Sequence, residues 1–115
     1  MREKLAGYAL DPAHKDGGPK AKGFATILGI TLSDIDYLEN TIRTAILQAP
    51  VSNVYIRARY GAQCEVKFPI AGLGAKSDRT VQVITGWEYA DPGGPPRMTT
   101  AYLKPEKHHN RQPEA

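Results

Sequence analysis

The chain has 115 residues, of which 41% are hydrophobic, and this length suits a single domain with a modest core. The net charge of +3 is mild, so it permits an RNA partner without requiring one. No apolar run approaches the roughly 20 residues that span a bilayer, and no apolar signal-peptide stretch follows residues 1–4. We therefore expect a cytoplasmic protein with no membrane partner, and the sequence does not indicate its oligomeric state.

The sequence lacks the motifs that are typical of metal sites and of acyl-enzyme catalysis. It contains no HExxH, no GxSxG, no CxxC and no spaced cluster of Asp and Glu. Cys64 is the only cysteine, and we interpret it as a small buried apolar side chain in a reducing compartment. We predict no metal and no cofactor.

The first part of the chain reads as helical after an ambiguous start. Residues 2–10 fit a helical turn or a short strand, and the sequence does not decide between them. A loop follows at 11–18, and Pro19 suits the first turn of a helix over about 19–28 that ends at Gly29. The apolar stripe predicted for this helix is Ala21, Phe24, Ala25 and Leu28.

A second helix is predicted to begin at Ser33. Asp36 lies three residues after this N-cap candidate, as in a weak capping box, and Pro50 ends the helix. Its apolar stripe comprises Ile35, Leu38, Ile42 and either Ala45 or Ile46.

From residue 54 onward the apolar residues alternate with period 2, which indicates strands. The expected strands are 54–60, 64–70, 81–89 and 98–103, joined by a turn at Gly61 and loops at 72–78 and 91–96. Short connections favour antiparallel neighbours. We predict an α+β fold in which two N-terminal helices pack on one face of a four-stranded, mainly antiparallel sheet. Residues 1–103 form this single globular domain, and residues 104–115 are expected to be a polar, disordered tail.

The loop and helix start near the N-terminus carry the first candidate functional residues. His14 lies beside glycines and basic residues, where an imidazole can accept and donate protons near neutral pH. Lys20 and Lys22 follow Gly17-Gly18 at a predicted helix start, which suits a phosphate. The alternatives are a surface histidine without a role and a solvated first turn. We predict that His14 and Lys20 are catalytic and that Lys22 binds RNA.

The predicted strands carry hydroxyl, aromatic and basic groups that suit a nucleotide. Thr85 and Thr100 are the candidate catalytic hydroxyls, and Trp87 shares the face of Thr85 and is expected to stack on a base. The alternatives are a tryptophan in the core and an ordinary Thr-rich edge strand. The other candidates for RNA binding are Arg97, Thr99 and Tyr102 on the last strand and Arg57 and Arg59, interleaved with Tyr55, on the first.

Three motifs together, KLAGYALDPAHKDGGPKAKGF, RTVQVITGW and PRMTTAYL, resemble an uncharacterised bacterial domain family over most of residues 4–103. Members of that family are small stand-alone proteins or C-terminal tips of large polymorphic toxins. The positions that carry the resemblance are Tyr8, His14, Gly18, Lys20, Ala21, Phe24, Thr85, Trp87, Thr99 and Thr100.

In fold, the chain is more loosely similar to the barnase–EndoU–colicin–RelE class of ribonucleases. That class places N-terminal helices before a four-stranded antiparallel sheet, and its toxins often use a histidine, a basic residue and Thr or Tyr in place of metal. The resemblance implies an RNA substrate (tRNA or mRNA), a cognate antitoxin or immunity protein, and delivery into the cytoplasm of a target cell for members of toxins. The folded part holds one histidine, which excludes a two-histidine mechanism.

Two hypotheses follow. The first is a metal-independent endoribonuclease toxin in which the 2′-hydroxyl attacks phosphorus, His14 is the acid or base, and Lys20 stabilises charge. The second is a non-catalytic interaction module or an antitoxin-type partner. The first requires that His14 fold back against the last two strands and form a basic cleft there, and we expect Lys20, Thr85, Thr100 and Trp87 to line that cleft.

Overall fold

The computed structural model describes residues 1–57, 61–89 and 95–104, with the backbone alone at 52, 53, 55–57 and 61. The first part of the chain is helical and comprises α1 (Arg2–Lys4), the π-helix η1 (Leu5–Ala9), α2 (Gly18–Leu28), the 3-10 turn η2 (Leu32–Asp34) and α3 (Ile35–Ala45). The strands follow as β1 (Val51–Arg57), β2 (Gly61–Ala71), β3 (Thr80–Tyr89) and β4 (Arg97–Leu103), with the 3-10 turn η3 (Gly74–Lys76) after β2.

The strands form one sheet in the order β1-β2-β3-β4, and every neighbouring pair is antiparallel. The α+β class and the antiparallel arrangement expected from the sequence are therefore confirmed. The first strand begins at Val51 rather than residue 54, because the long strand β2 offers Val66 as a partner for Val51. Gly61, expected in a turn, is the first residue of β2. Residues 58–60, most of the loop expected at 91–96 and the tail from residue 105 lie outside the described residues.

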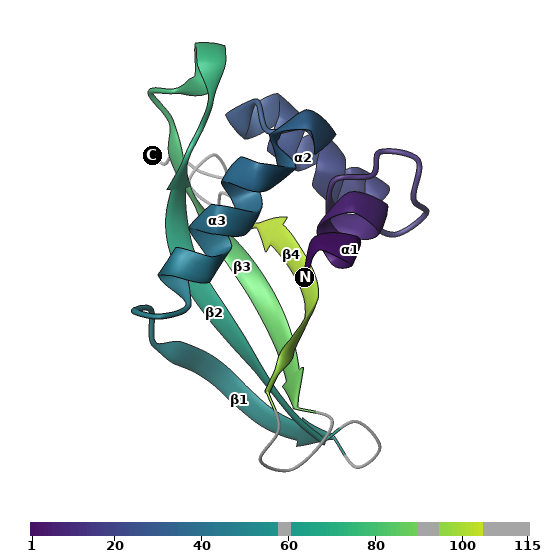
Figure 1. Ribbon diagram of the computed structural model, residues 1–115, viewed down its shortest axis with the longest axis vertical. Coiled ribbons are helices and arrows are strands. Elements are labelled where there is room, and N and C mark those ends of the chain that lie inside the picture. The colour runs from purple at the N-terminus through teal and green to yellow at the C-terminus, as the bar shows by residue number, and fades with distance from the viewer. Residues whose placement is uncertain (58–60, 90–94, 105–115) are drawn as a thin grey trace, which may run out of the picture.

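Helix α3 crosses one face of the sheet, as Figure 1 shows. Leu38 and Ile42, two members of its predicted stripe, are fully buried, and Ile35, Ala45 and Ile46 are partly buried against the same core. The strands supply the other half of this core, including Val66, Phe68, Val83, Trp87 and Ala101. We refer to this side of the sheet as the helix-covered face and to the opposite side as the open face.

Helix α2 and the N-terminal turns lie along the β4 edge of the sheet (Figure 1), where α1, α2 and η1 all contact β4. Phe24 and Leu28 of α2 extend into the common core. The expectation of two helices on one face is thus corrected, because the segment before residue 10 is helical as well. That segment buries Leu5 and Ala9 in the core and thereby occupies space beside β4.

The N-terminal turn is fixed to α3 by a pair of ionic contacts. Arg2 donates from Nη2 to Asp36 and from Nη1 to Glu39, each at 2.6 Å. The guanidinium groups of Arg43 and Arg2 lower the pKa of Glu39. Exposed ion pairs of this kind contribute little to stability because water screens them, so the burial of Leu5 dominates the anchoring.

The helix ends differ partly from the sequence prediction. Gly29 ends α2 with φ 68°, as expected for a glycine in the left-handed region. The capping box belongs to Thr31 and Asp34, not to Ser33 and Asp36, because a 3-10 turn precedes α3. Asp34 Oδ2 accepts the N–H of Thr31 at 3.0 Å.

Two further predictions concern burial and membranes. Cys64 is 6% exposed, as expected for a small apolar side chain, and burial raises the pKa of its thiol. Among residues 1–57, 61–89 and 95–104, no helix has both the length and the apolar composition required to cross a bilayer.

Candidate functional site

A cluster of polar and aromatic side chains surrounds Lys20 where the first turn of α2 meets β4. The Lys20 ammonium donates to Tyr8 Oη and, at 3.0 Å, to Thr100 Oγ1. It also lies 4.5 Å from the centre of the Tyr8 ring and 5.4 Å from that of Tyr102. We call Tyr8, His14, Lys20, Thr100 and Tyr102 the Lys20 cluster. It joins η1, the loop after it, α2 and β4.

The phenol of Tyr8 has a pKa below its ordinary value. The hydrogen bond from Lys20 is the largest cause that lowers the pKa of the phenol, and a hydrogen bond with Thr100 and the charge of Lys20 lower it further. Burial and the charge of Asp16 act in the opposite direction. Lys4 adds a second ammonium 5.4 Å from the ring centre. A phenolate at this position is therefore stabilised by cations.

His14 contacts the cluster through Tyr8. The two rings meet edge to face, with centroids 5.0 Å apart and planes at 82°. Nδ1 of His14 accepts backbone N–H bonds from Asp16 at 3.0 Å and from Gly17 at 2.9 Å. These two bonds assign the proton of the neutral imidazole to Nε2. His14 can thus donate from Nε2, while the loop backbone occupies its other nitrogen.

The loop that carries His14 lies against η1 because residue 17 is a glycine. A Cβ at Gly17 would stand 1.9 Å from the carbonyl oxygen of Tyr8, which no side chain tolerates. Tyr8 itself lies in a π-helix, a rare conformation that is frequent at functional sites. The contact between Gly17 and Tyr8 therefore positions the imidazole beside the phenol.

Thr100 and Tyr102 project from β4 on the open face of the sheet. Their direct partners on β3 are Gly86 and Ile84, whereas Ala101 pairs with Thr85 on the helix-covered face. A Cβ at Gly86 would lie 2.9 Å from Thr100 Cγ2 and 3.2 Å from Thr99 Oγ1. The glycine thus allows the side chains of residues 99 and 100 to lean over β3, and the irregular pairing just beyond Gly86 turns residue 99 in the same direction.

Thr85 and Trp87 do not belong to the cluster, contrary to the single cleft expected from the sequence. Thr85 is fully buried and donates its hydroxyl to the Val66 carbonyl at 2.9 Å. Its oxygen accepts the indole N–H of Trp87 at 2.8 Å, and Trp87 is 7% exposed. The alternation of side chains along the strand correctly predicted that these two residues share a face, but that face is the one that α3 covers. The spatial expectation thus holds for Lys20 and Thr100 and fails for this pair.

The other candidate residues have separate places. Arg97 donates from Nη2 and Nε to Glu88 Oε1, at 2.9 and 3.2 Å, so its guanidinium is already paired. Lys22 is exposed on the side of α2 away from Lys20. The side chains of Arg57 and Arg59 lie outside the described residues, and so does that of Tyr55.

Tyr8 is the functional candidate that sequence reasoning missed. The segment around it fitted either a helical turn or a strand, so no face could be assigned to its ring. The available signal was the motif KLAGYALDPAHKDGGPKAKGF, in which Tyr8 stands with His14 and Lys20. Within residues 1–57, 61–89 and 95–104, no group of three His, Cys, Asp or Glu side chains gathers as a metal site.

The family model for a domain of unknown function, DUF6883, matches residues 1–105, so the chain belongs to that family. No curated protein and no solved structure matches the chain. The family description names no activity, which leaves the chemistry of the Lys20 cluster as the guide to function.

Proposed function

We propose that this DUF6883 member is a metal-independent endoribonuclease that cleaves RNA by attack of the 2′-hydroxyl on the adjacent phosphate. The observation that supports this most strongly is the ammonium of Lys20 between Tyr8 and Thr100, with His14 against the same phenol. The site combines a cation, a donor and a potential base, which are the groups that phosphodiester transesterification needs.

Tyr8 is the general base in this proposal, whereas the sequence hypothesis had made His14 the acid or the base. A base requires a free lone pair, and Nδ1 of His14 already accepts two backbone N–H bonds. The phenol of Tyr8 has a lowered pKa because Lys20 and Thr100 stabilise its anion. A phenolate at that position takes the proton of the 2′-hydroxyl as the 2′-oxygen attacks phosphorus.

Lys20 and His14 stabilise the charge that develops on the phosphoryl oxygens. Two of the three ammonium protons of Lys20 are donated to Tyr8 and Thr100, and the third is offered to the phosphate. His14 adds the Nε2–H donor. The bond from phosphorus to the 5′-oxygen then breaks, and the leaving oxygen takes a proton from water. The products are a 2′,3′-cyclic phosphate and a 5′-hydroxyl end.

The remaining candidates contribute to substrate binding. Tyr102 presents an aromatic ring beside Lys20 on the open face, which suits stacking on a base. Arg97 and Thr99 border the same face farther along β4. In agreement with the resemblance described above, the substrate is tRNA or mRNA, the setting is a toxin acting in the cytoplasm, and a cognate antitoxin or immunity protein neutralises it.

The test is incubation of the purified protein with total RNA in EDTA. We expect cleavage that leaves cyclic phosphate ends, and we expect His14→Ala to reduce the rate by roughly 10²-fold, as for loss of one charge-stabilising donor. Tyr8→Phe should have an effect at least as large, because it removes the proposed base.

The control is Lys15→Ala, which removes an exposed cation from the same loop. Its rate should stay within a few-fold of wild type. Full activity in both His14→Ala and Tyr8→Phe would exclude the mechanism, and absence of cleavage by wild-type protein on all RNA fractions would exclude the function.

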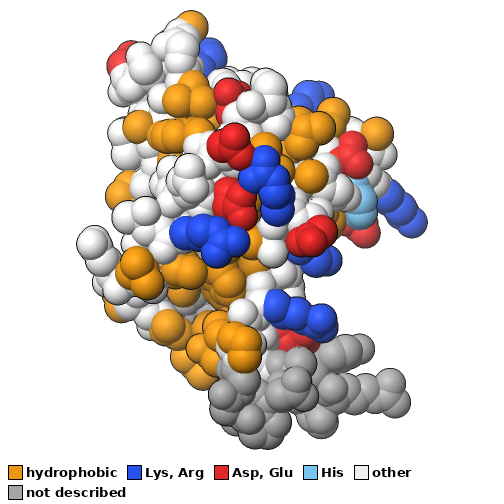
Figure 2. Space-filling model, viewed as in Figure 1, with side chains coloured by type: hydrophobic (Ala, Val, Ile, Leu, Met, Phe, Trp, Pro, Cys, Tyr) orange, Lys and Arg blue, Asp and Glu red, His pale blue; other side chains and the backbone are white. Residues whose placement is uncertain are grey.

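One observation favours the second candidate function, a protein-interaction module. Leu47, Val51 and Val54 are exposed at 83%, 53% and 66%, and they follow one another from the end of α3 into the edge strand β1. Figure 2 shows hydrophobic side chains gathered over this part of the surface. Growth separates the two functions: expression without a partner should arrest growth for a ribonuclease and leave it unchanged for a binding module.

A further inference from the structure

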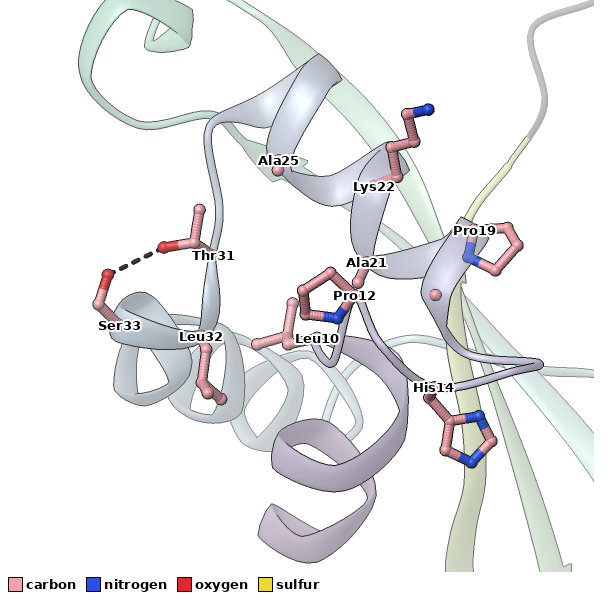
Figure 3. A pocket seen from close by; sticks show the side chains of 11 residues that line it. Leu10, Pro12, His14, Pro19, Ala21, Lys22, Ala25, Thr31, Leu32 and Ser33 are labelled. Atoms are coloured by element: carbon pink, nitrogen blue, oxygen red, sulfur yellow. Dashed lines mark hydrogen bonds between the residues drawn. The ribbon is translucent and has the colours of Figure 1, made fainter.

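A pocket of about 890 Å³ opens on the opposite side of α2 from Lys20. Its walls are apolar and consist mainly of Leu10, Pro12, Ala21, Ala25 and Leu32, and polar groups stand at its rim. Figure 3 shows that these side chains come from α2, from the segment after η1 and from Leu32 at the start of η2. The size and the apolar lining are those of a site for a small organic group.

The pocket exists because α2 presents small residues on this side. Gly18, Ala21 and Ala25 follow one another at helical spacing, so the helix backbone itself forms one wall. Leu32 faces them across the opening and remains 47% exposed. An apolar side chain of this size left half in solvent beside an open cavity has contact area to offer a ligand.

The rim carries groups that can read and hold a nucleotide. Thr31 Oγ1 takes part in the capping box with Asp34 and lies 2.9 Å from Ser33 Oγ. A hydroxyl has one donor and two acceptor sites, so Ser33 keeps capacity for a ligand beyond this contact. Lys22 stands at the other side of the opening and supplies positive charge. An apolar slot with hydroxyls at one edge and an ammonium at the other matches a nucleobase that is followed by a phosphate.

His14 connects this pocket to the Lys20 cluster. The residue lines the pocket, and its ring packs against Tyr8 at 5.0 Å between centroids. Lys20 and Lys22 lie about 200° apart around the first turn of α2, so one ammonium belongs to the Lys20 cluster and the other to the pocket. A strand of RNA that places one phosphate at Lys20 can pass over His14 and bring the neighbouring nucleoside to the pocket.

We propose that the pocket between α2 and residues 31–33 binds one unpaired nucleobase of the RNA, next to the phosphate held by Lys20. This inference rests on the proposed ribonuclease function for its choice of ligand. It predicts that the protein selects single-stranded RNA, because only an unstacked base can leave its neighbours and enter the pocket. The hydroxyl of Ser33 then discriminates among bases by their edges.

The test fills the pocket with Ala25→Phe and measures binding of two probes by fluorescence anisotropy. Ala25 lies on the pocket wall and is exposed, so the larger side chain has room without disturbing the core. The probes are a 2′-O-methyl RNA tetranucleotide, which cannot be cleaved, and the same oligomer with one abasic position. We expect Ala25→Phe to weaken binding of the first probe at least tenfold and to leave binding of the second unchanged. Thr26→Phe, on the exposed side of the same helix, is the matched control and should bind both probes like wild type.

The outcomes separate this inference from the proposed function. Equal affinity of wild type and Ala25→Phe for the base-containing probe would overturn the inference, and so would an equal loss for both probes. If wild-type protein cleaves no RNA but loses affinity on Ala25→Phe, the ribonuclease proposal fails and the base pocket stands. Should Ala25→Phe lose its circular-dichroism signal, Leu32→Ala provides a second variant, for which we expect about a threefold loss confined to the base-containing probe.

Discussion

The two faces of the sheet carry the same kinds of side chain and use them in opposite ways. On the helix-covered face, Thr85 lies between the Val66 carbonyl and the indole of Trp87, and all three groups are buried. On the open face, Thr100 lies beside Lys20 and a phenol that solvent can reach. A threonine and an aromatic ring build core in the first place and a candidate active site in the second.

The two sites differ in whether every hydrogen-bonding group already has a partner within the protein. The hydroxyl of Thr85 donates to an internal acceptor and accepts from an internal donor, and it is fully buried, so no ligand can reach it. The Lys20 ammonium has three protons, and two of them are directed at Tyr8 and Thr100. A candidate site differs from the core in having a hydrogen-bond donor that is still available beside solvent, and the residue types can be the same. The predictions below test this contrast, beginning with the largest effect.

Lys20→Ala should lower kcat by about 10²–10³-fold, because it removes the charge that stabilises both the Tyr8 anion and the phosphoryl oxygens. Steady-state cleavage of a fluorogenic RNA measures the effect. Lys22→Ala removes a cation only two residues away and should cost less than tenfold. Comparable losses in the two variants would show that α2 supplies general positive charge and no specific site.

The pH dependence of cleavage should follow Tyr8. Its pKa lies below the ordinary tyrosine value of about 10, so the active phenolate forms, and kcat/KM rises, as pH increases through that lowered pKa. Lys20→Met should move the rise to higher pH because the main stabilising partner of the anion is lost. Ultraviolet absorbance titration of wild type minus Tyr8→Phe gives the same pKa without activity. A rise that stays in place in Lys20→Met would contradict the assignment of the base.

Thr85→Val should destabilise the fold by about 1–3 kcal/mol and leave kcat unchanged. The substitution keeps the shape of the side chain but leaves the Val66 carbonyl and the Trp87 N–H unpaired in the core. Urea denaturation measures the stability. Thr80→Val, at an exposed position of the same strand, should change it by no more than about 0.5 kcal/mol. A large loss of kcat in a folded Thr85→Val protein would show that Thr85 contributes to catalysis.

Gly86→Ala should reduce kcat a few-fold with a small effect on stability. The added methyl group stands 2.9 Å from Thr100 Cγ2, so the β-branched threonine must shift away from Lys20. Gly23→Ala provides the control, because a Cβ at that position meets no atom within 4 Å. Identical kinetics for both variants would mean that the position of Thr100 does not matter.

Local rules accounted for much of the fold. The stripe of α3, the glycine that ends α2 and the alternating strands follow from short-range periodicity and turn chemistry, which the sequence displays directly. The capping box was wrong by two residues because Ser33 and Thr31 are both acceptable caps, and a 3-10 turn before α3 decided between them. The segment around Tyr8 stayed ambiguous because a π-helix has no distinct sequence period.

By itself, the sequence determined the α+β class, the order of helices and strands and the candidates His14, Lys20 and Thr100. Which face each strand residue occupies was known only as a pair of alternatives, since period 2 groups Thr85 with Trp87 without saying which side α3 will cover. The tertiary structure decided that side, and it also brought Tyr8 to Lys20 across the β4 edge. Lys20 contacts Tyr8, which is 12 positions away in the sequence, and Thr100, which is 80 positions away. Such contacts depend on how whole elements pack, and local propensity does not predict that packing.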